Sequence, residues 1–183
     1  KSVTRYPREG NPPPRIAETS FGMLNSIGLA NLGVEKYCEE IIPFLNKLKT
    51  KVIINIAGSV MEDYLETLEI LEDTNGKHIG YEINISCPNV KEGGMEFGIN
   101  PRTTEKLTLK MKNMTNKMLI MKLSPNVTSI EDIAIAAEQG GADAVSAINT
   151  VVGMGIDINT KKTKLFTNYG GLSGPAIKPI AIA

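Results

Sequence analysis

A cysteine stands at the polar end of a β-like apolar run, in the segment 84–89 (NISCPN). A free thiol has a pKa of about 8.5, so Cys87 could act as a general base near neutral pH, where an aspartate would be a much weaker base. The alternative is a buried cysteine that packs as a small hydrophobic side chain. Pro88 and the flanking Asn84 and Asn89 argue against a core position. The residues alone leave both interpretations open.

Three other apolar runs also end in a single amide or amine, at Asn55, Lys122 and Asn149. Helix-patterned segments separate these runs. This is the pattern of repeated β-then-α units in which each strand delivers one functional side chain to a common rim. A thiol, amides and an amine at one rim suggest chemistry on a small polar ring.

Lys122 has two functional interpretations. Burying a lysine costs several kcal/mol unless its ammonium meets an anion or an acceptor. The side chain could stabilise negative charge on a cofactor ring, or it could form a Schiff base, as in an aldolase. The structural alternative is a lysine that extends its ammonium to solvent.

The asparagines at the rim offer paired hydrogen-bond donors and acceptors, and Asn25 and Asn89 add two more. A planar ring with alternating C=O and N–H groups would suit such a set. The glycine-rich segment 170–174 (GGLSG) precedes a helix start, so its backbone N–H groups could also bind a phosphate.

Other reactive side chains fit structural roles better. Cys38 lies on the apolar face of a helical pattern and is expected to be structural. His78 is the only histidine, and it lies at a strand start, at the end opposite the proposed rim. The sequence offers no good candidates for metal binding or for catalysis by two carboxylates.

The elements that must position these residues repeat at about 30 residues, which predicts parallel strands. Residues 1–22 are expected to form a loop, and 151–169 a short hairpin that turns near 160–162. The predicted strands are 51–57, 79–86, 118–123 and 143–149, and the predicted helices are 34–48, 60–72 with Ser59 as N-cap, 101–115 and 129–139.

Composition limits the class of protein. The 183 residues are 42% apolar, and 20 basic side chains balance 20 acidic ones, so no basic field for nucleic acid is expected. Two cysteines that lie far apart in the sequence favour reduced thiols and a cytoplasmic setting. The sequence has no uninterrupted run of about 18 apolar residues, so a membrane-spanning segment is not expected. A β/α barrel typically needs about 250 residues. We therefore expect one partial α/β domain over 1–183, a (β/α)8 TIM barrel fragment that lacks the first strand and the last βα units.

Seven motifs together resemble dihydroorotate dehydrogenase across essentially the whole chain. At position 87 the membrane-bound class has serine, so the cysteine here resembles the pattern of the soluble class 1 enzymes. Segments 91–98 and 171–179 resemble the NAD-dependent type 1B catalytic subunit. The motifs are 1–4 (KSVT), 9–12 (EGNP), 25–29 (NSIGL), 84–89 (NISCPN), 122–126 (KLSPN), 148–150 (INT) and 170–175 (GGLSGP).

The resemblance implies a barrel that carries FMN and oxidises dihydroorotate to orotate in pyrimidine biosynthesis. Cys87 would remove the proton from C5 of the substrate, and a hydride would pass from C6 to FMN. Lys1 would touch both flavin and substrate. The other implied substrate contacts are Asn25, Ser26, Ile27, Gly28, Leu29, Asn84, Asn149 and Thr150. The other implied FMN contacts are Ser2, Asn55, Asn84, Lys122, Ile148 and Gly174.

The resemblance also implies a homodimer joined to a second subunit that carries FAD and a [2Fe-2S] cluster, with NAD as electron acceptor. Type 1A, a homodimer that uses fumarate, is the nearest alternative. Dihydropyrimidine dehydrogenase fits less well, because Asn89 follows the Cys-Pro pair where that family tends to have histidine. A Schiff-base lyase using Lys122 and a non-catalytic barrel fragment are the alternatives from other classes.

Overall fold

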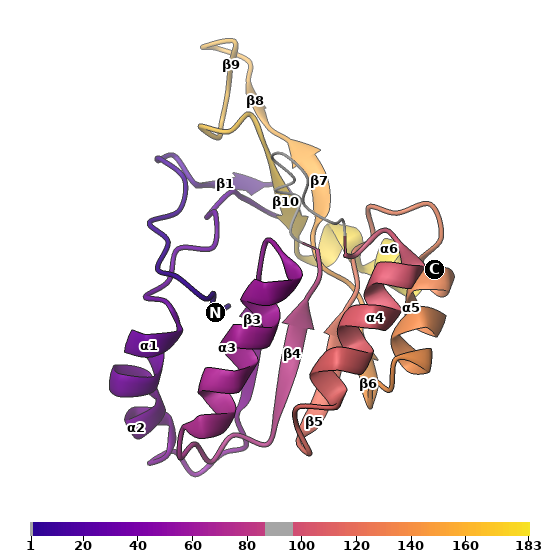
Figure 1. Ribbon diagram of the computed structural model, residues 1–183. Coiled ribbons are helices and arrows are strands. Elements are labelled where there is room, and N and C mark those ends of the chain that lie inside the picture. Colours follow the sequence, from indigo (N-terminus) through magenta and orange to yellow (C-terminus); the bar gives the residue numbers. More distant parts are fainter. Residues whose placement is uncertain (1, 87–96) are drawn as a thin grey trace.

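The computed structural model describes residues 2–86 and 97–183, which form two four-stranded sheets and flanking helices (Figure 1). The first sheet is parallel, in the order β3-β4-β5-β6, as the repeated βα pattern predicted. In the described part of the chain, β3 and β6 are the edge strands of this sheet. The outer side of β3 makes a single bridge, between Ile56 and Val3. The strands are β3 (Ile53–Ala57), β4 (Gly80–Asn84), β5 (Met118–Lys122) and β6 (Ala144–Ser146).

Helices α3 (Met61–Asp73), α4 (Pro101–Lys112) and α5 (Ile130–Gln139) follow β3, β4 and β5 in the chain and cover one face of this sheet (Figure 1). Successive strand residues point to opposite faces. Over β3, β4 and β5 the helix-covered face is almost fully buried, whereas the opposite face carries half-buried polar side chains such as Asn55 and Lys122. The buried residues of this layer include Ile54, Ile56, Tyr81, Ile83, Leu119, Met121, Tyr64, Leu68, Leu71, Leu107, Met111 and Ile133.

Side chains accept hydrogen bonds from backbone N–H groups at the starts of α3, α4 and α5, although the prediction of Ser59 as an N-cap is wrong. The N-cap of α3 is Val60, and the Asp63 carboxylate accepts hydrogen bonds from the backbone N–H groups of Ser59 and Val60 at 2.7 and 3.2 Å. An acidic side chain in the first turn satisfies amides that the helix leaves unpaired. Asn100 caps α4 and Ser129 caps α5, each through its side-chain oxygen.

The predicted helix over 34–48 is confirmed over 34–45, but it includes a π-helical stretch and ends three residues early. The segment divides into α1 (Val34–Lys36), the π-helix η1 (Tyr37–Ile41) and α2 (Ile42–Leu45). Pro43 has no backbone N–H to donate. Just before it, the Ile42 N–H donates to Tyr37 O, five residues back. Because the helical region ends at Leu45, Leu48 lies beyond it and is 40% exposed.

The second sheet is antiparallel, in the order β1-β2-β10-β7, and lies beyond the end to which the β4 arrow points (Figure 1). Its strands are β1 (Ile16–Thr19), β2 (Gly22–Asn25), β7 (Val151–Met154) and β10 (Tyr169–Ser173). One expectation is therefore wrong, because residues 16–19 are a strand rather than loop. Residues 170–173, which carry the predicted phosphate-binding backbone, also lie in a strand, and phosphate binding by them stays a prediction. Pairing between β2 and β10 joins residues nearly 150 positions apart, with |i−j| = 146 for Asn25 and Gly171.

The expected hairpin after residue 151 is confirmed. Strand β8 (Ile156–Asp157) pairs with β9 (Lys162–Thr163), and the connection lies between them. The chain then ends in a 3₁₀ turn, η2 (Pro175–Ile177), and α6 (Lys178–Ile182). No helix formed by the described residues is both long and apolar enough to cross a membrane.

A polar network lies at the starts of the parallel strands. The Tyr81 hydroxyl donates to the Glu72 carboxylate at 2.6 Å, and Thr115 and Lys117 donate to the same oxygen. Burial alone would raise the pKa of Glu72, but these three hydrogen bonds outweigh it and lower the pKa. Burial and the same carboxylate raise the pKa of Tyr81. The network therefore holds a charged carboxylate next to a neutral phenol.

His78 completes this network as a neutral side chain. Because the Tyr81 proton goes to Glu72, the His78 Nε2 must donate to the Tyr81 oxygen, 2.6 Å away. Nδ1 is buried and has no hydrogen-bond partner among the described residues. Burial, and secondly the nearby Lys117, lower the pKa of His78 from its ordinary 6.5. Protonation would place an unpaired N–H in the interior.

We expect acid to destabilise the protein through His78. A histidine whose pKa is lowered by folding contributes stability that is present above pH 6.5 and is lost as the pH falls below it. The midpoint of urea unfolding should therefore fall between about pH 8 and about pH 5, before the carboxylates titrate. His78→Gln keeps a donor for Tyr81 but does not titrate, so its midpoint should fall less. If the urea midpoint fell equally with pH in the wild-type protein and in the variant, this role of His78 would be contradicted.

The buried face of α4 provides a second test, with a control in the same helix. Leu107 is 0% exposed and Leu109 is 50% exposed. Leu107→Ala should lower the free energy of unfolding by about 2–5 kcal/mol, because it leaves a cavity in the core. Leu109→Ala should change it by less than about 0.5 kcal/mol, since the side chain lies mostly in water. Equilibrium urea unfolding measures both, and similar losses would show that α4 packs differently.

Candidate functional site

Parallel pairing lines up four residues at the carboxyl ends of the strands. Ala57 pairs with Asn84, Asn84 with Lys122, and Lys122 with Ser146. Two residues before this row, Asn55 pairs with Glu82. Residues two apart on a strand share a face. The polar side chains of both rows therefore project from the same face, the one that the helices leave uncovered.

Glu82 lies at the centre of these side chains. The Asn55 amide Nδ2 donates to Glu82 Oε2 at 2.6 Å, and the Ser146 hydroxyl donates to Oε1 at 2.8 Å. The Lys122 ammonium is 3.6 Å from Oε2, and the side chains of Lys122 and Glu82 are 29% and 23% exposed. Lys122 is therefore paired with a carboxylate, which none of its sequence-based interpretations had identified.

Sequence reasoning missed both Glu82 and Ser146. The signal for Glu82 was present, because Tyr81, Ile83 and Ile85 are buried on one face of β4 and its extension. Alternation then places Glu82, Asn84 and Ser86 on the other face. The signal for Ser146 was its place as the one hydroxyl within the apolar run 144–148 (AVSAI), three residues before Asn149.

Asn84 and Asn149, both predicted site residues, meet directly. The Asn149 amide Nδ2 donates to Asn84 Oδ1 at 2.8 Å. The Asn149 backbone N–H donates to Leu123 O at 2.8 Å, which continues the pairing beyond the end of β5. The Thr150 N–H donates to Asn149 Oδ1 at 2.8 Å. The structure therefore brings Asn84, Asn149 and Thr150 into one hydrogen-bonded group, with Ile148 in the segment that leads to it.

Thr150 joins this group to the second sheet. A Cβ on Gly171 of β10 would lie 2.1 Å from Thr150 Oγ1, so only glycine permits this approach. On the other side of β10, the Asn25 amide donates to Gly171 O at 3.3 Å. The predicted residues Asn25 and Thr150 thus flank the same glycine. Gly174, by contrast, lies beside Gly22, at the opposite end of β2 from Asn25.

The predicted substrate loop 26–29 has a defined backbone path. Gly28 and Leu29 adopt φ angles of 73° and 59°, in the left-handed region. Asn11 holds the loop from one side, because its backbone N–H donates to Ile27 O at 3.1 Å and its side chain donates to Ser26 O at 3.0 Å. Asn31 holds it from the other side and donates to Leu29 O at 2.7 Å. The Ser26 hydroxyl is buried without a partner among the described residues.

The N-terminal segment lies against the edge of β3. The Val3 N–H donates to Asn55 O at 2.8 Å, and the Ala57 N–H donates to Val3 O at 2.9 Å. This pairing places Ser2 next to the strand that carries Asn55, as its predicted role requires. Lys1, Cys87 and Asn89, the three remaining predicted site residues, lie outside the described residues.

The residues present fit a planar heterocycle such as FMN. The Asn55 Oδ1 is buried and has no hydrogen-bond partner in the described part of the chain, so it is available to an N–H donor. Lys122 supplies a positive charge near an anionic ring edge, and the Asn84–Asn149 pair offers further amide groups on the same face. No group of three or more potential metal-ligating side chains occurs among the described residues.

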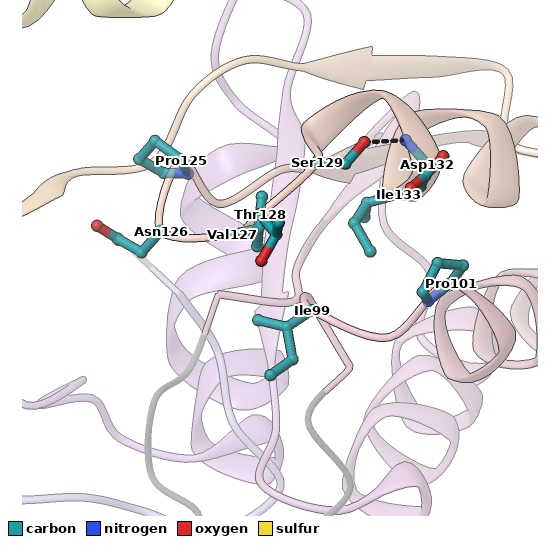
Figure 2. Close-up of a pocket in the computed structure, with 9 residues that line it drawn as sticks. All are labelled: Ile99, Pro101, Pro125, Asn126, Val127, Thr128, Ser129, Asp132 and Ile133. Carbon is teal, nitrogen blue, oxygen red and sulfur yellow. Dashed lines mark hydrogen bonds between the residues drawn. The ribbon is translucent and has the colours of Figure 1, made fainter.

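A separate pocket of about 510 Å³ lies between the β5–α5 connection and the starts of α4 and α5 (Figure 2). Among the described residues that line it, Asp132 is the charged one, and its backbone N–H donates to Ser129 Oγ at 3.3 Å. Asn126 joins this pocket to the site, because its side chain also donates to Thr150 O at 3.0 Å. The pocket is lined by Ile99, Pro101, Pro125, Asn126, Val127, Thr128, Ser129, Asp132 and Ile133.

Comparison with known proteins agrees with this geometry. The profile of the dihydroorotate dehydrogenase family matches residues 1–183. The dihydroorotate dehydrogenase B (NAD(+)) catalytic subunits of Alkaliphilus oremlandii and Bacteroides thetaiotaomicron are 53% and 50% identical to the chain, each over 182 residues. The same subunit of Thermoanaerobacter sp. (strain X514) is 54% identical over 183 residues.

Each of these relatives is matched over 100% of this chain and 60% of its own length. The chain thus spans about three fifths of the proteins that it resembles. The chain belongs to the dihydroorotate dehydrogenase family.

Proposed function

We propose that this chain forms the FMN-binding part of a type 1B dihydroorotate dehydrogenase, which oxidises dihydroorotate to orotate in pyrimidine biosynthesis. The observation that carries this proposal is the grouping of Asn55, Lys122, Asn84 and Asn149 on one uncovered face of the parallel sheet. Identities of 50–54% to subunits named for this activity support it. The four strands would be part of a (β/α)8 barrel completed by the remainder of the protein.

Each described group has a role in this proposal. Bound FMN would accept the hydride that leaves C6 of dihydroorotate. Lys122 would stabilise negative charge at the ring edge, and Asn55 would accept a hydrogen bond from a ring N–H. Ser2, Ile148 and Gly174 would provide further flavin contacts.

The substrate would lie next to the flavin, within reach of both sheets. Asn84 and Asn149 would hold its ring and carboxylate through amide hydrogen bonds, together with Thr150 and Asn25. Residues 26–29 would close over the substrate, and the buried Ser26 hydroxyl would find a partner there. Lys1 would contact both flavin and substrate. Cys87 would take the proton from C5 as the general base.

The electron acceptor and partners follow the relatives. Their name, catalytic subunit of an NAD(+)-dependent enzyme, indicates that each functions with another subunit. We propose that a homodimer of this protein joins an electron-transfer subunit with FAD and a [2Fe-2S] cluster, and that the assembly is cytoplasmic. The fumarate-using type 1A and the Schiff-base lyase are less well supported, because neither is named among these relatives.

Flavin reduction tests the proposal directly. The purified full-length protein should be yellow, and anaerobic dihydroorotate should bleach its visible absorbance in a single turnover. Cys87→Ser should slow this bleaching by orders of magnitude near neutral pH, because a hydroxyl is a much poorer base than a thiol.

Cys38→Ser is the matched control, since Cys38 lies in η1, where it packs against the apolar core. This variant should bleach at the wild-type rate. A colourless protein that traps a carbonyl substrate on Lys122 with borohydride would instead support the lyase. Unchanged bleaching by Cys87→Ser would remove Cys87 from the role of base.

A further inference from the structure

Glu82 is the point at which side chains from all four parallel strands converge. It extends from β4 and is approached by Asn55 from β3, Lys122 from β5 and Ser146 from β6. Two of these three residues are proposed flavin contacts. The function proposed above gives Glu82 itself no role.

The carboxylate determines which way the Asn55 amide faces. An ionised carboxylate accepts hydrogen bonds and donates none. Asn55 must therefore turn its NH₂ group toward Glu82, at 2.6 Å, and its Oδ1 away. That oxygen is buried and lacks a partner among the described residues. A neutral amide in place of Glu82 could accept or donate, so the orientation of Asn55 would no longer be determined.

The same carboxylate partly cancels the positive charge of Lys122. The Lys122 Nζ and Glu82 Oε2 are 3.6 Å apart, and both side chains are more than two thirds buried, so the pair is weakly screened. A bound ring at this rim would therefore sense a lysine with a nearby counter-charge. The size of the positive potential at the ring depends on both groups.

We propose that Glu82 is a positioning residue of this site, which presents the Asn55 oxygen to a flavin N–H and limits how strongly Lys122 favours the reduced flavin. This inference depends on the proposed function. A hydride carries two electrons and one proton, so its transfer adds one negative charge to the flavin. Glu82 opposes that charge, and Lys122 stabilises it.

The test compares Glu82→Gln with the wild-type full-length holoprotein. Removing the negative charge should raise the affinity for reduced FMN about tenfold relative to oxidised FMN, which equals about +30 mV in a two-electron midpoint potential. The affinity for oxidised FMN should fall at least threefold, because Asn55 is no longer oriented. Equilibrium titration against redox dyes and flavin-release measurements provide the two values.

Two controls separate this role from general effects of charge and packing. Glu105→Gln removes the same charge from the exposed surface of α4, so the midpoint potential should stay unchanged. Ser146→Ala removes a hydrogen bond from Glu82 but keeps its charge, so the ratio of the two affinities should also stay unchanged. A Glu82→Gln potential equal to that of Glu105→Gln would overturn the inference.

If Glu82→Gln does not fold, a second variant, Glu82→Asp, still tests the inference. Glu82→Asp keeps the charge but is too short to reach Asn55, so it should weaken binding of oxidised FMN and leave the ratio of affinities near wild type. Unchanged binding by this variant would also overturn the inference. A wild-type protein that binds no FMN, or whose flavin dihydroorotate does not bleach, would instead contradict the proposed function.

Discussion

Parallel pairing of β3, β4, β5 and β6 is the constraint on which the remaining structure depends. The register sets Ala57, Asn84, Lys122 and Ser146 side by side at the strand ends. Because side chains alternate along a strand, the same register sends Ile56, Ile83 and Met121 to the opposite face. Because α3, α4 and α5 bury the apolar face, the side chains of the other face must point away from the helices, whether or not those polar groups interact with one another. A slip of one residue would exchange the two faces.

The polar face places charge where burial makes it costly. Lys122 and Glu82 are mostly buried, and removal of one partner would leave the other charge uncompensated. Asn55 and Ser146 satisfy the remaining capacity of the carboxylate. The ion pair therefore restricts the Lys122 side chain at the rim of the sheet, whereas a solvent-exposed lysine would adopt many conformations. A binding site for a flat polar ligand benefits from such a pre-organised charge.

The second sheet completes the site by close backbone approach. Asn149 joins Asn84 of the first sheet, and Thr150 leads directly into β7 of the second. Gly171 allows β10 to approach Thr150, and Asn25 reaches the same strand from β2. Residues from both sheets thus meet near the strand ends. Asn11 and Asn31 hold the loop 26–29 beside them through backbone carbonyls.

Much of this arrangement could be predicted from the sequence. Apolar runs that repeat at about 30 residues, separated by amphipathic helical patterns, predicted the parallel sheet, and the polar residue at the end of each run identified Asn55, Asn84, Lys122 and Asn149. These signals are local, because the side chain's place in the strand follows from alternation alone. The predicted helix over 34–48 is present over 34–45, and its π-helical stretch lies just before Pro43, which has no backbone N–H to donate.

Tertiary structure decided what depends on partners distant in the chain. The glycine-rich segment 170–173 is a strand because β2 and β7 supply its hydrogen bonds, and one partner lies 146 residues away. The role of Glu82 follows in the same way, because its neighbours come from three other strands. By itself, the sequence determined which residues face the rim, since that depends on spacing. The pairing of those residues depends on strand register and on contacts across the two sheets, which only the folded chain provides.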